Sequence, residues 1–161
     1  MKTVKFDAVG AVVYAKKWAL KRNPQFYNFD NIGGDCTNFI SQCIYSGAKT
    51  MNYTPIMGWY YKSINNRAPA WTGVNELYSF LINNKSIGPF ATQVQISKVE
   101  LGDVIQLWKS NKGYFHTLIV SEITPYSIYV CSHSRDALNF PLERFNFDKL
   151  RCLRISGVNV K

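Results

Sequence analysis

DVIQLWKSNKGYFHTLIVSEITPYSIYVCSH, residues 103–133, is the stretch of this chain that decides its fold class. It contains three short segments rich in β-branched and aromatic residues, which are separated by SNKG and by ITPY. Such segments, bounded by glycine, proline and small polar residues, predict three antiparallel strands joined by tight turns. Residues 151–155 have a similar composition and predict a further strand.

Helical patterns precede this strand-rich region. Residues 6–22 carry apolar side chains near helical spacing, and Pro24 then stops the helix. A second helix is predicted from about residue 36 to residue 45 and is closed by Gly47, and a third covers residues 74–83. Helices first and antiparallel strands afterwards indicate an α+β fold rather than a doubly wound parallel sheet.

Length and composition limit the class of protein. At 161 residues and 18.4 kDa the chain has room for one domain, so we expect residues 1–161 to fold as a single domain. A hydrophobic content of 47% excludes a disordered or collagen-like chain. Four cysteines are too few for a disulfide scaffold, and they leave the redox compartment open.

The net charge of +9 points to an anionic partner. The basic residues are scattered and form no stripe, which argues against nucleic acid as that partner. The longest apolar run near the start, Ala8 to Ala15, is too short for a membrane span, and it lacks the cleavage site of a signal peptide. We expect neither a membrane span nor a secretory leader, and the sequence assigns no compartment.

The most unusual local feature is the run Gly33-Gly34-Asp35-Cys36. Two glycines permit a tight turn directly before a helix, and the cysteine falls in the first helical turn. The free N–H groups and the dipole at a helix start favour a thiolate, and the same N–H groups can receive an oxyanion. Cys36 is therefore a candidate nucleophile, the alternative being a small apolar residue of the core.

A cysteine nucleophile needs a base, and the chain has only two histidines, His116 and His133. If the turn between their strands is centred between Thr124 and Pro125, the two imidazoles lie opposite each other on one face of the sheet. His116 would then take the proton of the thiol, and His133 would orient His116. A turn centred one residue later would place Ser134 or Arg135 opposite His116 instead.

Other chemistry is less well supported by the spacing. Asp136 is a second candidate for orienting His116. No zinc-binding spacing occurs, so we predict neither a metal nor a cofactor. The aromatic residues Trp59, Tyr60 and Trp71 belong either to the core or to a substrate groove beside the nucleophile. The remaining cysteines have apolar neighbours and are predicted core thiols: Cys43, Cys131 and Cys152.

Several segments occur in the order typical of one family. They are AVVYAKKWALKRNPQFYNF, GGDCTNFISQCIYSG, MGWYY, LGDVIQ, HTLIVSE and YVCSHSRD. In these segments the chain resembles the putative amidase domains of bacteria, which are similar to papain-like cysteine peptidases of the NlpC and CHAP type. The resemblance extends from about Val9 to Ile155, and GGDCTNFISQ is its most specific string.

The resemblance implies a papain-like fold, in which a nucleophile-bearing helix packs on an antiparallel sheet. It matches Cys36 to the nucleophile and His116 to the base. The third catalytic member matches His133, with Asp136 in reserve, and Asp35 matches an acidic position that supports the oxyanion pocket. One departure is Ser134, where the family usually has threonine.

These observations lead to one main hypothesis of function. We expect a monomeric cysteine amidase or peptidase that acts through a thioester acyl-enzyme on peptide or amide bonds of bacterial peptidoglycan. Its partner would be an anionic cell-wall polymer or a peptide substrate. Two alternatives are a non-catalytic binding module on the same scaffold, and an acyltransferase or deamidase with the same triad. The sequence leaves open a phage lysin, a housekeeping enzyme or an effector.

Overall fold

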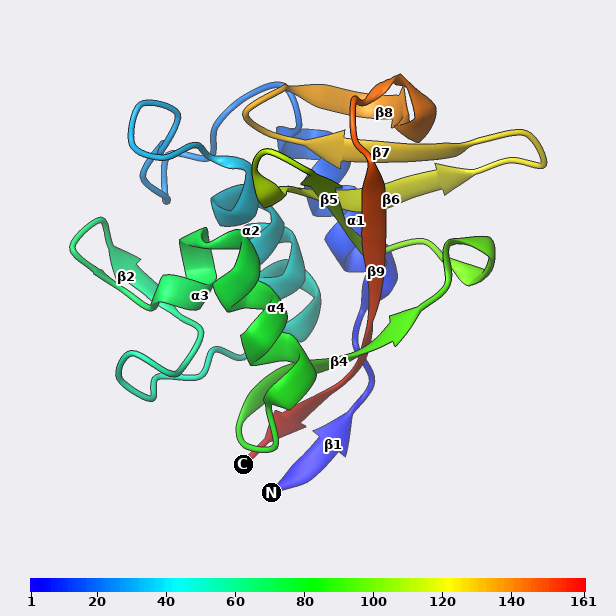
Figure 1. The fold of residues 1–161 in the computed structure, drawn as a ribbon. Helices are drawn as coiled ribbons and strands as arrows, with labels where there is room; N and C mark the ends of the chain where they lie inside the picture. The colour runs from blue at the N-terminus through cyan, green and yellow to red at the C-terminus, as the bar shows by residue number, and fades with distance from the viewer.

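The computed structural model describes residues 1–161 and shows an α+β fold (Figure 1). The helices are α1 (Ala8–Trp18), α2 (Cys36–Ala48), α3 (Pro69–Thr72) and α4 (Val74–Asn83), with short 3-10 helices η1 (Ile96–Lys98) and η2 (Leu142–Arg144). The strands are β1 (Lys2–Val4), β2 (Tyr61–Ser63), β3 (Asn66–Arg67), β4 (Gly88–Val94), β5 (Val104–Lys109), β6 (Gly113–Ile123), β7 (Ile128–Ser132), β8 (Ala137–Pro141) and β9 (Lys149–Val160). The predicted α+β class is confirmed.

Seven strands form one antiparallel sheet in the order β1-β9-β5-β6-β7-β8, and β4 also pairs with β9. Because the C-terminal strand β9 pairs with β1, the two ends of the chain lie side by side, with Lys2 opposite Val160. The helices cover one face of this sheet, and the hairpin of β2 and β3 projects on the same side (Figure 1).

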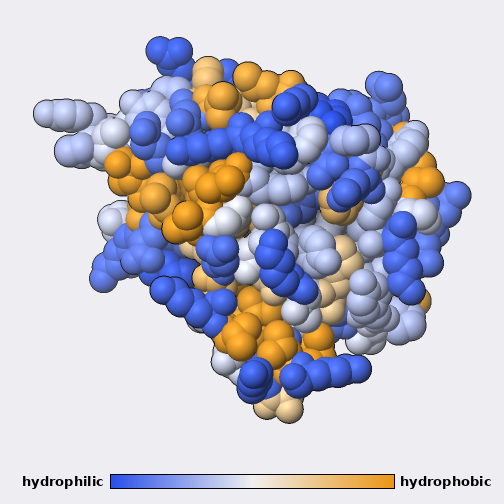
Figure 2. Space-filling model, turned by 180° about the vertical axis from the view of Figure 1, so that it is seen from behind, coloured by the Kyte–Doolittle hydropathy of each residue, from blue (hydrophilic) through white to orange (hydrophobic).

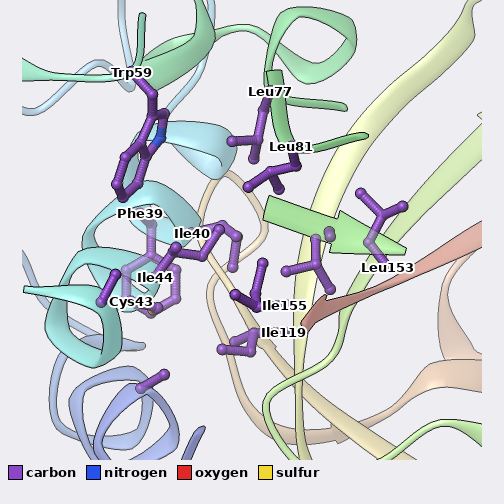
Figure 3. Close-up of a cluster of buried hydrophobic side chains, with 14 of the residues drawn as sticks. Phe39, Ile40, Cys43, Ile44, Trp59, Leu77, Leu81, Ile119, Leu153 and Ile155 are labelled. Atoms are coloured by element: carbon purple, nitrogen blue, oxygen red, sulfur yellow. The ribbon is translucent and has the colours of Figure 1, made fainter. Parts of the chain in front are cut away.

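Strand alternation divides the apolar side chains between the two faces of the sheet. Val104 and Ile119 face the helices, whereas their neighbours Ile105 and Leu118 belong to a second cluster on the other face. Figure 3 shows the larger cluster, in which side chains of α2 and α4 meet side chains of β6 and β9. Because α2 lies at the centre of this core, packing fixes the position of the helix that begins with Cys36.

The second helix runs beyond its predicted end. Gly47 lies inside α2, and Lys49 supplies the left-handed C-cap with a φ of 56°. The glycine permits a close approach, because a Cβ atom there would lie 2.5 Å from the carbonyl oxygen of Asp7 and 2.6 Å from the ring of Phe6. The prediction that Gly47 ends the helix was wrong, since its small size serves packing.

The turn between β6 and β7 differs by one residue from the predicted register. Ile119 pairs with Cys131 and Val120 with Val130, and a bulge then shifts the pairing so that Glu122 faces Tyr129. Continued from Ile119, this register places residue 134 opposite residue 116. The predicted pairing of the two histidines was therefore wrong, and the alternative turn position is the one observed.

Other elements differ in extent from the sequence prediction. The first helix, α1, ends at Trp18 rather than at residue 22, whereas α4 has the predicted bounds. Strands β1, β4 and β8 were not predicted, because edge positions leave them with mixed polar and apolar sequences.

No helix has the length and apolar character needed to cross a bilayer. Figure 2 shows separate hydrophobic patches among hydrophilic residues on the back of the molecule, which is ordinary for a protein surface.

Candidate active site

Cys36 is the first residue of α2 and is 9% exposed. Its Sγ lies 3.7 Å from Oγ1 of Thr37, which is in turn 2.9 Å from Oγ1 of Thr117 on β6. The Cys36 N–H donates no hydrogen bond within the chain, as is usual for the first N–H group of a helix. The sulfur and a free N–H donor therefore belong to the same residue at the helix start.

The protonation of this thiol differs from the sequence-based expectation. Burial raises the pKa of Cys36 above its ordinary value, and hydrogen bonds from the backbone of Thr117 and from Thr37 offset only part of that rise. Desolvation therefore outweighs the N–H groups at the helix start, which by themselves would favour a thiolate. Cys36 rests as a neutral thiol.

His116 lies on β6, directly before Thr117, and is 7% exposed. Its ring packs against Phe115 and Phe145, with centroid separations of 6.1 and 5.8 Å. Its Nε2 atom is buried without a hydrogen-bond partner. Burial, with a smaller contribution from the positive charge of Arg135, lowers the pKa of His116 to about 4. The imidazole is therefore neutral at pH 7 and can accept a proton.

One pocket of about 340 Å³ brings the two groups together. Its lining includes the nucleophile candidate, the base candidate, the two glycines before α2 and residues from the turn after β7. The full lining is Gly33, Gly34, Cys36, Leu107, Lys109, Phe115, His116, Ser134, Arg135, Phe145 and Asn146. A thiol, an unpartnered imidazole and an open space beside both are the components that acyl transfer needs.

The turn before Cys36 is built as predicted from the glycine pair. Gly33 and Gly34 have φ values of +80° and +98°, which residues with a side chain rarely adopt. A Cβ atom on Gly34 would also lie 3.1 Å from Oγ of Ser134. That hydroxyl accepts a hydrogen bond of 2.7 Å from the N–H of Asp35, so the turn after β7 is tied to the start of α2.

His133 occupies a different position from the one predicted. Its Nδ1 lies 2.6 Å from Oδ2 of Asp35, its Nε2 lies 2.7 Å from the carbonyl oxygen of Trp18, and its ring stacks on Phe39. Both ring nitrogens are thus engaged away from His116. The predicted contact between the two imidazoles is absent, because the shifted register and the pull of Asp35 turn His133 toward the helices.

Asp35 is completely buried and does not line the pocket. Its carboxylate accepts hydrogen bonds from the N–H of Phe29 at 2.8 Å and from the amide of Asn38 at 2.9 Å, in addition to the contact with His133. The carbonyl oxygen of Trp18 can only accept, so Nε2 of His133 carries a proton.

Asp136 likewise lies outside the pocket. Arg22 binds it through two hydrogen bonds of 2.9 and 3.0 Å, binds Asp30 at 3.0 Å, and lies 3.6 Å from Asp35. Arg22 falls at the end of the helix predicted for residues 6–22, where no motif marks it, so this arrangement was missed. The guanidinium joins the segment before α2 to the turn between β7 and β8, and Asp136 does not contact His116.

Two of the three aromatic residues proposed for a substrate groove, Trp59 and Trp71, lie in the core instead. Trp59 and Trp71 are fully buried, and their indole N–H groups donate to Ser41 at 3.0 Å and to Asn38 at 2.9 Å, both on α2. Tyr60 packs beside an exposed tyrosine, and none of the three aromatic residues lines the pocket at Cys36. Trp59 and Trp71 therefore hold α2 through hydrogen bonds to its side chains.

The other cysteines are core thiols, as predicted. Cys43, Cys131 and Cys152 are free and at most 1% exposed. No group of three or more histidine, cysteine or acidic side chains is arranged to hold a metal ion. Lys109 and Arg135 line the pocket and were missed as site residues, because charged residues in strands and turns carry no motif.

Comparison with known proteins identifies the family. Residues 5–155 match the model of a family described as "Putative amidase domain". Two proteins of Bacillus subtilis (strain 168) are similar: YhbB is 38% identical over 119 residues (71% of this chain, 37% of that protein), and YjcM is 30% identical over 146 residues (86% and 33%). Both are described as uncharacterized, and this chain spans about a third of the length of each. No solved structure matches the chain. Nearly the whole of its length is covered by the family model, and the chain belongs to the putative amidase domain family.

Proposed function

We propose that this chain is a cysteine-dependent amide hydrolase with a papain-like architecture, formed by residues 1–161 as one domain. Membership of the amidase family suggests amide hydrolysis. The observation that carries the cysteine mechanism is the shared pocket, where the thiol of Cys36 at the start of α2 accompanies the unpartnered imidazole of His116.

In the first step, His116 removes the proton of the Cys36 thiol as the sulfur attacks the carbonyl carbon of the amide. Both groups are neutral at rest, so the step creates a thiolate and an imidazolium together, and in a buried site these opposite charges attract each other strongly. The free N–H of Cys36 supports the developing oxyanion. When the intermediate collapses, the C–N bond breaks, His116 returns the proton to the departing amine, and a thioester remains on Cys36.

In the second step, water hydrolyses the thioester. His116 is again neutral and removes a proton from the attacking water, the C–S bond breaks, and the proton goes to the sulfur. The products are the free acid and the resting thiol. Deamidation releases ammonia by the same steps, and acyl transfer replaces water with another nucleophile.

In this mechanism His133 and Asp35 hold the elements of the site in place and do not react. Their buried pair links the first residue before α2 to the backbone of α1 and to the end of β7. The phenyl rings of Phe115 and Phe145 hold the plane of His116, which has no hydrogen-bonded orienting group. We therefore propose a Cys36–His116 dyad, with His133 as a positioning residue.

The proposed substrate is a peptide or amide bond of bacterial peptidoglycan, an anionic polymer that suits a chain of net charge +9. Purified cell walls are incubated with the protein, and new amino and carboxyl termini are identified by mass spectrometry. Cys36→Ala is expected to lower the release of termini by about 10³-fold or more. Cys152→Ala removes a thiol outside the pocket and serves as the matched control. Release by Cys36→Ala at the wild-type rate would refute the proposal.

A further inference from the structure

The charged side chains that line the pocket at Cys36 are all positive. Two of its eleven lining residues, Lys109 and Arg135, are basic, and none is acidic. Neither side chain forms an ion pair within the chain. Asp30, Asp35 and Asp136, which are near the site in sequence, bind Arg22 or His133. Glu143 accepts a hydrogen bond from the hydroxyl of Ser127, and Asp148 accepts one from the N–H of Ser110, so neither forms an ion pair with the two cations. Both cations are thus left without a counter-charge beside the reacting groups.

Arg135 is held in place without being neutralised. Its guanidinium packs over the rings of Phe140 and Phe145, at 5.0 and 4.7 Å, and donates to the carbonyl oxygen of Arg144 at 3.3 Å. Phe145 also packs against His116, so one ring lies against both the cation and the base. A fixed guanidinium with free N–H groups is suited to a carboxylate.

The positive charge of Arg135 acts on the candidate base, His116. After burial, it is the second contribution that lowers the pKa of His116. Lys109 lies at the end of β5, opposite Gly113 and two positions from Leu107, which pairs directly with His116. The two cations therefore approach the pocket from different elements, Lys109 from the end of β5 and Arg135 from the turn between β7 and β8.

We infer that this pocket selects amide substrates that carry a free carboxylate next to the scissile bond, with Arg135 and Lys109 as its binding residues. The inference rests on the proposed function, because it assigns a substrate class to the same site. A carboxylate bound there would be paired with charges that have no other partner, whereas a cationic group would meet two like charges.

Two alkylating reagents test this inference without any knowledge of the natural substrate. Iodoacetate and iodoacetamide are close in size, react with a thiol by the same displacement of iodide, and differ in negative charge. Labelling of Cys36 is followed by peptide mass spectrometry, and each rate is divided by the rate for glutathione. We expect this normalised ratio to favour iodoacetate by about tenfold at low salt and to fall as salt is added.

Variants locate the origin of the preference. Arg135→Gln and Lys109→Gln are each expected to lower the ratio by about threefold, and Arg135→Lys to retain most of it. Lys85→Gln makes the same charge change in the loop between α4 and β4, at the far end of the molecule in Figure 1, and should leave the ratio unchanged. Thermal melting verifies that each variant is folded.

The outcomes separate this inference from the proposed function. The inference would be overturned if wild-type Cys36 showed no more preference for iodoacetate than glutathione does. It would also be overturned if Lys85→Gln lowered the normalised ratio as much as Arg135→Gln does. Neither result affects the proposed function, which is tested separately by the cleavage of cell walls with wild type and Cys36→Ala. Alkylation reports on the pocket even if no amide is cleaved, so each idea can fail alone.

Discussion

Because the imidazole of His116 is buried and neutral, the free energy of unfolding should depend on pH by an amount that can be calculated. Its pKa is about 4 in the folded chain, whereas an unperturbed histidine has a pKa of about 6.5. The unfolded chain therefore binds a proton at this site between pH 6.5 and pH 4, and the folded chain does not. Because the unfolded state takes up more protons in this window, stability falls as the pH falls through it.

The size of the effect follows from the difference between the two pKa values. At about 1.4 kcal/mol for each unit, His116 lowers the free energy of unfolding by about 2 kcal/mol between pH 7 and pH 5. The loss reaches about 3 kcal/mol at pH 4, and this site contributes little further loss below that. Replacing His116 by glutamine, which does not titrate, removes this component and leaves the contributions of the other groups.

Urea unfolding of wild type and His116→Gln at pH 7, 6 and 5, followed by tryptophan fluorescence, measures the difference. Four tryptophans supply the signal. The variant loses ring packing and is expected to be less stable at pH 7, but its deficit should shrink by about 2 kcal/mol at pH 5. A deficit that stays constant within about 0.5 kcal/mol would refute the claim that His116 is buried in its neutral form.

Two further predictions concern the residues that hold the site in place. His133→Gln breaks the contact with Asp35 and should lower the free energy of unfolding by about 3–5 kcal/mol, as measured by urea titration. If His133 only positions α2, the folded variant keeps the wild-type pH profile of cleavage; a displaced acid limb would show that it acts on His116 directly. Gly47→Ala forces a Cβ atom to 2.5 Å from the backbone of the segment before α1, and it should cost about 1–3 kcal/mol. An unchanged unfolding midpoint would show that this contact relaxes freely.

The α+β class and the nucleophile helix could be predicted from local sequence. Strand alternation and turn residues identified β5, β6 and β7, and the glycine pair marked the start of α2. These signals act over a few residues, so a single sequence contains them. Strand β1 pairs with β9 across the whole length of the chain, β4 pairs with residues far beyond it in sequence, and no local pattern encodes such pairing.

The two reacting residues of the candidate site were predictable from the sequence, but the rest of its lining and its contacts were not. Cys36 and His116 were identified from the helix start and the small number of histidines, and the structure brings both to one pocket. The partner of His133 was not predictable, because one residue of register decides whether its ring faces His116 or Asp35. The protonation of Cys36 also depends on burial by tertiary packing, which outweighs the helix start.

The central claim is that Cys36 carries the acyl group during amide cleavage. Its most direct test is rapid acid quenching of the protein during turnover of purified cell-wall peptides, followed by mass spectrometry of the peptide that contains Cys36. We expect a thioester adduct on Cys36, which alkaline hydroxylamine removes and which is absent from Cys36→Ala. An adduct on another residue, or continued cleavage by Cys36→Ala, would contradict it.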